Sequence, residues 1–581
     1  MPKLVLMFFC LISMSANAQN LRIVGDSNSG AGCTSSDLGT AMTLAMSDPD
    51  FDEIRLTNAA MVYNNISLQI SNQAITIKGG YETCADAVTD NPSANAKTIL
   101  KGTTLTPVVS LISSGATYTV ILERLGITGG KSDINSGQNG GGIFVNGDWQ
   151  LSVIDSDIYG NAAVNNGGGI YLGDPDNSGA DPGLILKGTR IYSNSALNGG
   201  GVYSKTFWGG QHTSITFEGD NQIDNNLATS SGGGLYILGS QESADDILSN
   251  AQTGNIKINN NEAGTGGGVY FSNVDFDLFY GGKLYLENNT ANSGAALYLY
   301  LNSSLRSYGA VIQNNTMAGT SAYSGVVTIS RGSVWTDKTL KFTNNISNSN
   351  MIYIGGSYSN YLGGVFCSNS IESDTRAFFV LDDANLRVKS ALICQNTGGN
   401  TIVRTSAGTG DSSIKLVGST VADNAKRSME PLDTIFDMTG PDIGQSNSST
   451  YSFYANIINN SATETLAYAG NVSPTFDKGC SIVEETATFP ATFVRLITGD
   501  PQFQDANSMD YQPGLSSPAV DACEVGSIGT SLANLDDIIG NPRGIDIPFV
   551  ANGPGHYDMG AYEVTDEVAD DTLFKSGFES N

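Results

Sequence analysis

The feature that most constrains this chain is a glycine run that recurs along its middle and precedes an apolar segment each time. The regular copies read Gly-Gly-Gly, then Ile, Val or Leu, then Tyr, and the runs start at residues 140, 167, 199, 232, 266 and 294. Successive starts are 27, 32, 33, 34 and 28 residues apart. A fixed period of about 20–50 residues is typical of solenoids, in which each repeat packs only against its neighbours.

Short alternating strands, rather than helices, fill these repeats. Apolar and polar residues alternate at 184–187, 256–258 and 283–286, and Gly, Asn and Ser turns separate the segments. A repeat that already holds two or three strands has no room for a helix of ordinary length. The sequence therefore predicts an all-β parallel β-helix, and about 12–14 coils at about 4.8 Å per coil would give a rod on the order of 60 Å long.

A recurring asparagine accompanies the glycine runs. Asn hydrogen-bonds locally in turns and tolerates the left-handed conformation, and stacked Asn side chains bond from one strand layer to the next. We expect these glycines and asparagines to be structural, because glycine permits positive φ and close backbone approach. The predicted members of the ladder are Asn161, Asn194, Asn226, Asn261, Asn289, Asn315, Asn345, Asn396 and Asn424.

The N-terminal part precedes the regular repeats. Residues 35–47 have helical spacing of apolar side chains, with Ser35 or Ser36 as the N-cap and Asp48-Pro49 as the stop. A helix here would cover the open end of the core. Strands are predicted after it at residues 53–56, 74–78, 98–101 and 118–122.

The organisation along the chain follows from where the period begins and ends. The regular repeats span 120–465, and prolines, of which they hold only four, become frequent after them. We expect a signal peptide at 1–18, an N-terminal cap with the first coils at 19–119, the β-helix at 120–465, a non-repetitive module at 466–563 and an acidic flexible tail at 564–581.

Charge and the N-terminus indicate an exported protein. Lys3, the apolar stretch 4–14 and the Ala-x-Ala site at 16–18 have the form of a secretory signal peptide. No other segment is apolar over 18 residues, so no transmembrane helix is expected. The formal charge of −29 disfavours nucleic acid and purely electrostatic binding to anionic lipid. Solubility explains this charge, and calcium bound by surface Asp and Asn is the alternative.

Six cysteines remain after the signal peptide, an even number that suits an oxidising compartment. Cys367 and Cys394 stand in matching contexts 27 residues apart, which is one repeat. Stacked coils about 4.8 Å apart would bring them within disulfide distance. A disulfide and an unbonded cysteine stack are both compatible with this spacing. The other cysteines are Cys33, Cys84, Cys480 and Cys523.

Two family resemblances follow from motifs. The Gly-Gly-Gly-Ile/Val/Leu units with their Asn turns resemble the repeats of polymorphic outer-membrane proteins and related right-handed parallel β-helix surface proteins. The C-terminal segment is similar to the choice-of-anchor Q module of bacterial surface proteins, through four motifs: Asp500-Pro501-x-Phe503, 517–522 (Ser-Pro-Ala-Val-Asp-Ala), Asn541-Pro542-Arg543 and Asp558-x-Gly560-Ala561-Tyr562-Glu563. The resemblances imply a right-handed helix at the bacterial cell surface or outer membrane, and residues 574–579 are a candidate sorting motif.

Right-handed β-helices also include polysaccharide lyases and glycoside hydrolases, which is the alternative function. Hydrolysis would need two carboxylates about 5–9.5 Å apart, and the candidates are Asp382, Asp383 and Asp423. Lyase chemistry needs a positioned Lys or Arg as the base. A metal site is not expected at either histidine, because neither has a Cys or His neighbour at metal-ligand spacing. The charged residues and histidines considered are Lys187, Arg190, Asp174, Asp181, His212 and His556.

The leading hypothesis is a secreted or surface-exposed, non-catalytic, adhesin-like scaffold that binds a glycan, a cell surface or a protein. No catalytic, cofactor-binding or metal-binding residue is assigned, and calcium is the one ion considered. Aromatic residues that could stack on sugars are Phe207, Trp208, Tyr353, Tyr358 and Tyr361.

Overall fold

The computed structural model describes most of the chain between residues 20 and 565. The described ranges are 20–25, 30–48, 50, 52–57, 63–103, 105–113, 115–133, 138–173, 182–206, 213–239, 246–250, 254–278, 282–357, 359–405, 412–438, 450–460, 462–468, 475–477, 479–484, 496–524, 536–548, 550 and 555–565. The predicted signal peptide and the 574–579 motif lie outside these residues.

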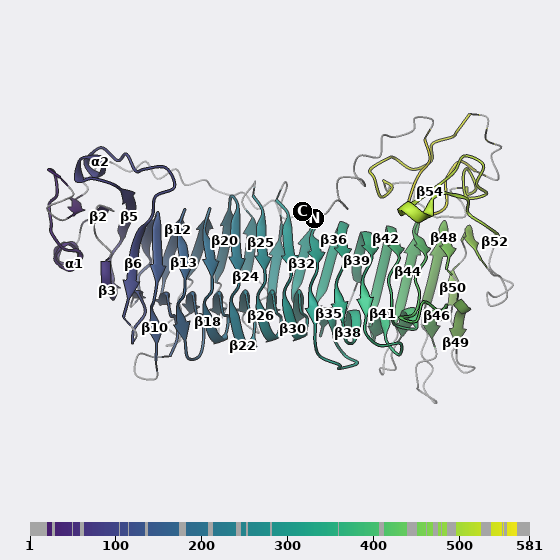
Figure 1. The fold of residues 1–581 in the computed structure, drawn as a ribbon, viewed down its shortest axis with the longest axis horizontal. Coiled ribbons are helices and arrows are strands. Elements are labelled where there is room, and N and C mark those ends of the chain that lie inside the picture. The colour runs from purple at the N-terminus through teal and green to yellow at the C-terminus, as the bar shows by residue number, and fades with distance from the viewer. Residues whose placement is uncertain are drawn as a thin grey trace.

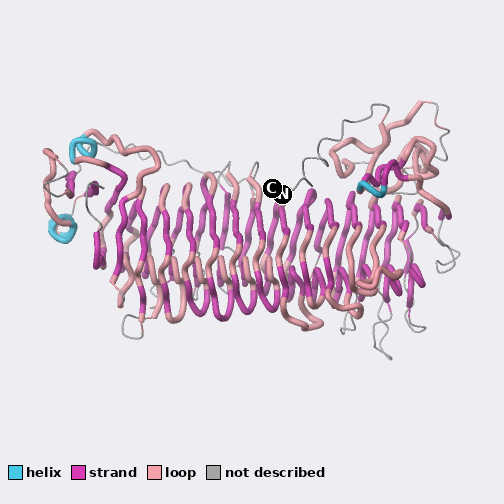
Figure 2. Tube along the Cα trace, viewed as in Figure 1, coloured by secondary structure: helices cyan, strands magenta, loops and turns pink. Residues whose placement is uncertain are grey.

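The molecule is a long rod of stacked coils, and its fold is the parallel β-helix that the glycine period predicts (Figure 1). Two short helices, α1 (Leu38–Met46) and α2 (Cys84–Val88), lie at the N-terminal end. A C-terminal module rests on one side of the rod at the opposite end (Figure 2). That module contains β53 (Phe503–Asp505), η1 (Ala506–Ser508) and β54 (Asp510–Pro513).

A 29-stranded sheet supplies two strands of each coil, arranged as two parallel columns. The strands of column 1 are β1 (Asn20–Val24), β2 (Asp52–Thr57), β5 (Ile75–Tyr81), β8 (Tyr118–Glu123), β12 (Trp149–Ile154), β16 (Gly183–Lys187), β20 (Ser214–Glu218), β24 (Asp246–Asn250), β28 (Val274–Asp277), β32 (Ser304–Ser307), β44 (Ser413–Val417), β47 (Thr450–Tyr454) and β50 (Thr475–Asp477). Column 2 comprises β3 (Tyr63–Ile66), β6 (Thr98–Gly102), β9 (Leu125–Thr128), β13 (Asp157–Tyr159), β17 (Arg190–Tyr192), β21 (Asn221–Asp224), β25 (Ile256–Asn259), β29 (Leu284–Glu287), β33 (Val311–Gln313), β45 (Thr420–Ala422), β48 (Asn456–Asn459), β51 (Ser481–Val483) and β52 (Leu496–Thr498). Three longer strands run through both columns: β36 (Val334–Thr343), β39 (Ser359–Cys367) and β42 (Asn385–Cys394).

Two further sheets close each coil. The 9-stranded sheet holds β10 (Lys131–Ser132), β14 (Ala162–Ala163), β18 (Ser195–Asn198), β22 (Leu227–Ser231), β26 (Glu262–Thr265), β30 (Thr290–Ser293), β34 (Thr316–Met317), β37 (Ile346–Ser347) and β40 (Ser370–Ile371). The 14-stranded sheet holds β4 (Leu68–Ser71), β7 (Val109–Ile112), β11 (Ile143–Asn146), β15 (Ile170–Gly173), β19 (Val202–Lys205), β23 (Leu235–Leu238), β27 (Val269–Ser272), β31 (Leu297–Tyr300), β35 (Gly325–Ser330), β38 (Asn350–Gly355), β41 (Ala377–Asp382), β43 (Thr401–Thr405), β46 (Leu432–Met438) and β49 (Ala462–Tyr468). Parallel pairing continues past residue 465, as far as β52.

Alternation of apolar and polar residues builds the core. In β12, every second side chain is buried, and β29 and β31 follow the same pattern. Successive side chains of a strand point to opposite faces, so one set fills the interior of the rod and the other faces outward. Trp149 and Trp335 are the largest fully buried side chains of this interior.

The repeated asparagines form the predicted ladder, which runs through eleven coils. Each side-chain amide except that of the last member, Asn460, donates to the side-chain oxygen of the Asn one coil further on, at 2.8–3.1 Å. Asn369 and Asn460 join the nine predicted members. The left-handed conformation belongs to the residue before each ladder position from Asn161 to Asn424, such as Asn225 and Asn260.

The glycine runs are explained by positive φ angles and by the close approach of backbone atoms in the following coil. Gly232, the first residue of its run, has a φ of 66°. A Cβ on the next residue, Gly233, would lie 2.4 Å from the carbonyl oxygen of Gly267 in the following coil. The tyrosine after each run stacks on the one in the next coil, with ring centroids 4.7–5.4 Å apart from Tyr171 to Tyr298. These residues therefore hold the coils together.

The N-terminal helix differs from the prediction in its cap. The N-cap is Asp37, whose side chain accepts a hydrogen bond from the Thr40 amide, rather than Ser35 or Ser36. The four apolar residues of its inner face are buried: Leu38, Ala41, Met42 and Ala45. Helix α2 was not predicted, because it spans a single turn and begins with a Thr83–Asp86 capping box.

Three disulfides join the six cysteines. Cys367 and Cys394 face each other in register on adjacent coils, and they are bonded. This pairing decides between the two states that the sequence left open. The other two bonds, Cys33–Cys84 and Cys480–Cys523, tie the N-terminal segment together and link the C-terminal module to the rod.

Candidate functional site

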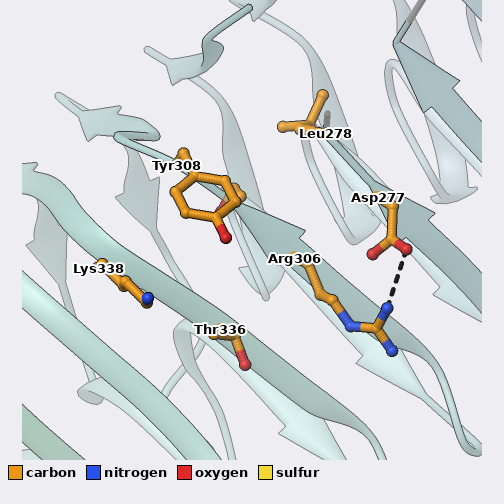
Figure 3. Close-up of a pocket in the computed structure, with 7 residues that line it drawn as sticks. Asp277, Leu278, Arg306, Tyr308, Thr336 and Lys338 are labelled. Atoms are coloured by element: carbon orange, nitrogen blue, oxygen red, sulfur yellow. Dashed lines mark hydrogen bonds and ion pairs between the residues drawn. The ribbon is translucent and has the colours of Figure 1, made fainter. Parts of the chain in front are cut away.

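A pocket opens on the outer surface of the 29-stranded sheet, where its two columns meet (Figure 3). Asp277 of β28 pairs in register with Arg306 of β32, which pairs with Thr336 of β36, so three successive coils supply these side chains. The cavity has a volume of about 190 Å³. Its lining residues are Asp277, Leu278, Arg306, Ser307, Tyr308, Thr336 and Lys338.

Asp277 is the carboxylate of this pocket. Its Oδ2 accepts a hydrogen bond of 3.0 Å from Arg306 (Figure 3). Its Oδ1 is buried and has no hydrogen-bond partner among the described residues. Burial raises the pKa of Asp277, and the Arg306 guanidinium offsets part of that rise. An unsatisfied buried acceptor costs about 1–3 kcal/mol, so Oδ1 is an atom that a ligand's donor would satisfy.

Tyr308 forms the opposite side of the pocket in Figure 3. It follows β32 directly, and its side chain is 60 % exposed, which is unusual for a large ring in this molecule. In Figure 3, Arg306 lies between Asp277 and Tyr308, Thr336 lies below them, and Lys338 lies on the far side of Tyr308, so these three residues supply the other hydrogen-bonding groups. An aromatic wall with convergent polar groups is typical of small-ligand sites.

A fully buried carboxylate, Asp337 of β36, fixes the loop that carries Tyr308. It accepts hydrogen bonds from the Ser307 hydroxyl (2.7 Å) and from the amides of Gly309 (3.1 Å) and Ala310 (2.9 Å). It also accepts from the Thr339 amide at 2.9 Å. Burial raises the pKa of Asp337, while these hydrogen bonds lower it. The pocket wall is thus held by the strand of the next coil.

The predicted carboxylates have separate structural partners. Asp382 ends β41 in the 14-stranded sheet, and its Oδ2 accepts a hydrogen bond of 2.7 Å from Tyr353. Asp423 follows β45 of column 2 and accepts a hydrogen bond of 2.8 Å from Tyr511 of the C-terminal module. Asp383 and Asp423 both occupy left-handed turn positions, with φ of 51° and 53°. We find no shared site for these carboxylates in the described part of the chain.

The two predicted aromatic platforms that the structure describes, Tyr353 and Tyr361, are not open rings. Tyr353 is 6 % exposed and bonded to Asp382. The ring of Tyr361 lies 5.0 Å beneath the Lys389 ammonium. Three other predicted aromatic residues, Phe207, Trp208 and Tyr358, lie outside the described residues.

The predicted charged residues take part in surface pairs. Arg190 donates two hydrogen bonds of 2.8 Å to Asp224, which raises its pKa. Lys187 lies 3.8 Å from Glu218, and the ring of His556 stacks on Tyr557. Three further candidates fall on residues that the structure leaves undescribed: Asp174, Asp181 and His212.

Three of the four C-terminal motifs converge on a buried polar network. Arg543 is buried and donates to the Ser390 hydroxyl (3.3 Å) and the Gly418 carbonyl (3.1 Å) of the rod. Glu563 accepts from the amides of Gly544 (2.6 Å) and Ile545 (2.9 Å). Burial raises the pKa of Glu563 to about 7.

A second buried carboxylate completes this network. Asp558 accepts from the amides of Asp521 (2.7 Å) and Val564 (2.6 Å). Burial raises the pKa of Asp558 well above its usual range, and the neighbouring Glu563 raises it further. These contacts orient the module on the rod, and the network is closed to solvent.

The described residues carry neither a metal-ligand cluster nor a membrane-spanning helix. These residues include no group of three or more His, Cys, Asp and Glu side chains that could hold a metal ion. None of their helices is long and apolar enough to cross a membrane. No protein-family model matches the chain, and no curated protein matches it.

The pocket could not be predicted from the sequence, because Asp277, Arg306 and Thr336 come from three successive coils and lie about 30 positions apart. The outward positions of β28 and β32 hold charged residues, which is a weak signal by itself. The exact register of the coils, which brings Asp277 next to Arg306, becomes visible only in the structure.

Proposed function

We propose that this protein is an exported, surface-exposed β-helix scaffold that binds an extracellular glycan at the pocket between Asp277 and Tyr308. The observation that carries the proposal is a pocket in which Asp277, whose Oδ1 has no hydrogen-bond partner among the described residues, lies opposite the exposed ring of Tyr308. Non-catalytic binding is the simplest role for such a pocket on a rigid rod.

The chemistry of the pocket suits a sugar. Sugar rings present C–H groups that pack on aromatic faces, and their hydroxyl groups both donate and accept hydrogen bonds. Asp277 Oδ1 would accept from a hydroxyl, while Arg306 and Thr336 would donate to ring or hydroxyl oxygens. Since Asp337 holds the loop of Tyr308 in place, little ordering would be needed on binding.

Export and surface location belong to the same proposal. The signal-peptide pattern at 1–18 and three disulfides favour an oxidising extracellular setting. Three of the four motifs that resemble the choice-of-anchor Q module are joined by hydrogen bonds in the folded chain, through Arg543, Asp521 and Glu563, which supports reading them as one unit. The resemblance to polymorphic outer-membrane repeats rests on the Gly and Asn pattern and supports a bacterial surface role.

The alternative is a polysaccharide lyase or glycoside hydrolase. Asp277 is the single carboxylate lining the pocket among the described residues, whereas hydrolysis uses two carboxylates across the scissile bond. The pocket therefore favours binding, and turnover is measured in the same experiment.

A glycan array with the mature protein tests this proposal. Tyr308→Ala and Asp277→Asn should each abolish or strongly weaken any signal, since the first removes the ring and the second the charged acceptor. Tyr323→Ala is the matched control, because Tyr323 is 64 % exposed and lies against Tyr353 rather than in the pocket. Retained binding by both pocket variants would contradict the proposal. Release of reducing or unsaturated ends, lost in Asp277→Asn, would favour the enzyme instead.

A further inference from the structure

We infer that the glycan is an anionic polysaccharide that runs along the rod axis from the pocket over a cationic track formed by Lys338, Arg387, Lys389 and Lys415. This inference rests on the proposed function and names the class of its ligand. The track lies on the same outer surface as the pocket and shares Lys338 with it.

Strand register places these cations in line with the pocket. In column 1, Thr336 of the pocket pairs with Tyr361, which pairs with Arg387, which pairs with Lys415. These positions follow one another from coil to coil along the rod. At about 4.8 Å per coil, the four steps from Arg306 to Lys415 cover about 19 Å.

A second line of cations lies where the two columns meet. Lys338 and Lys389 flank Gly363, whose added Cβ would lie 2.7 Å and 2.6 Å from their carbonyl oxygens. Because Gly363 has no side chain, the coil between the two lysines presents only backbone there. The line continues from the pocket toward Ser390, where the C-terminal module begins to cover the rod.

The cations of the track repel one another. Burial lowers the pKa of Lys389, and Lys415, Arg387 and Lys338 lower it further as neighbouring positive charges. In the described part of the chain, none of the four forms an ion pair with an acidic side chain. By contrast, Arg190, Arg306 and Arg404 on the rod each have an aspartate partner.

Unpaired positive charge is unexpected in a chain with a formal charge of −29. A clustered set of like charges is unfavourable unless a ligand of opposite sign binds it. An anionic group placed among the four cations would remove this repulsion. The local charge thus selects an anionic ligand while the pocket selects a sugar.

The geometry favours a polysaccharide over other polyanions. The rise of one sugar unit in an extended chain is close to the coil spacing, so successive units would meet successive coils. Tyr308 provides one exposed ring at the end of the track, whereas Lys389 covers the ring of Tyr361. A single open ring suits the terminal sugar of a bound segment, and single-stranded nucleic acid would need several. The negative charge of the whole molecule also opposes long nucleic acids.

The test uses a hexameric uronate oligosaccharide, its methyl ester, a sulfated hexasaccharide and a single-stranded DNA of matched charge. Titration calorimetry on the mature chain should show binding of the uronate or the sulfated hexamer that weakens with salt. The methyl ester should bind at least about ten-fold more weakly, a difference of about 1.4 kcal/mol. Which of the two anionic hexamers binds more tightly identifies the anionic group.

A triple substitution in the track and a matched triple elsewhere on the rod test which positive charges bind the ligand. Lys338→Gln/Lys389→Gln/Lys415→Gln should lower affinity for the anionic hexamer at least about ten-fold and flatten its salt dependence. Lys187→Gln/Lys257→Gln/Lys283→Gln makes the same change of net charge elsewhere on the rod and should leave affinity unchanged. Circular dichroism and thermal melting confirm that both triples fold.

The outcomes separate this inference from the proposed function. Binding of the methyl ester as tightly as the acid, with loss in Tyr308→Ala, would overturn the anionic track and leave the pocket standing. Binding that needs the track but not Tyr308 would overturn the pocket. DNA that binds as tightly as the hexamers, or a track triple that binds normally, would overturn the inference.

Discussion

At the residue scale, the repeated asparagines stabilise the fold, whereas Asp277 belongs to the pocket. The ladder asparagines are buried, and each bonds to two neighbouring coils, as Asn289 does through Asn261 and Asn315. Their repetition could be predicted from sequence, because stacking requires the same residue at the same place in every coil. Asp277 could not be singled out in this way, because its importance depends on an oxygen that lacks a partner.

Asn289→Ala should destabilise the rod by about 3 kcal/mol, since it leaves the Asn261 amide and the Ile258 carbonyl without their partners. Chemical denaturation followed by circular dichroism measures this change. Asn292→Ala is the control on the same coil, because Asn292 is exposed, and it should change stability by less than about 0.5 kcal/mol. Equal effects of the two substitutions would contradict a structural ladder.

At the element scale, the pocket depends on how one strand supports the loop of another. Strand β36 passes through both columns, and Asp337 within it holds the turn between β32 and β33. Alternation predicted strands at 283–286 and 118–122, and the structure has β29 and β8 there. The merging of two columns in β36, β39 and β42 was not predictable, because it depends on pairing with earlier coils.

Asp337→Ala should lower glycan affinity although Asp337 touches no ligand, because the Ser307–Ala310 turn loses its acceptors. Hydrogen exchange of residues 307–310 should quicken, and Asp337→Asn should restore part of the protection by keeping one oxygen acceptor. A variant with fast exchange in this turn and full affinity would show that the turn does not position Tyr308.

The C-terminal module should be less stable at higher pH. Burial raises the pKa of Glu563 from 4.5 to about 7, so the folded state binds more protons than the unfolded state between these values. Stability therefore falls as pH rises from about 4.5 to about 7. Thermal melting across this range should show the fall, and Glu563→Gln should flatten it. An identical pH profile in the variant would contradict this assignment.

At the scale of the whole molecule, the repeat period predicted the rod but not the position of the C-terminal module. The glycine spacing predicted a solenoid of 12–14 coils; the 14-stranded sheet matches this number, whereas each column of the 29-stranded sheet has 16 strands, because parallel pairing extends past both ends of the regular repeats. The position of the C-terminal module was not predictable, because Arg543 reaches rod residues more than 100 positions away. The module covers the rod beyond the cationic track, where the Ser390 hydroxyl donates a hydrogen bond to the Asp536 carbonyl of the module.

Arg543→Met should loosen the module while leaving the rod intact. The substitution removes its hydrogen bonds to Ser390 and Gly418 and leaves Glu563 and Asp558 without a nearby cation, a loss of about 3–5 kcal/mol. Limited proteolysis should then cut within residues 496–565 first. Arg427→Met is the control, since Arg427 is 61 % exposed, and its digestion pattern should match that of the unmodified protein.

The most direct measurement is a crystal structure of the mature protein with a bound uronate or sulfated hexasaccharide. Our account predicts a sugar ring packed on Tyr308, a hydroxyl group within hydrogen-bond distance of Asp277 Oδ1, and anionic groups beside Lys338 and Lys389 along the rod axis. A hexasaccharide bound elsewhere on the rod, with the pocket between Asp277 and Tyr308 empty, would contradict it.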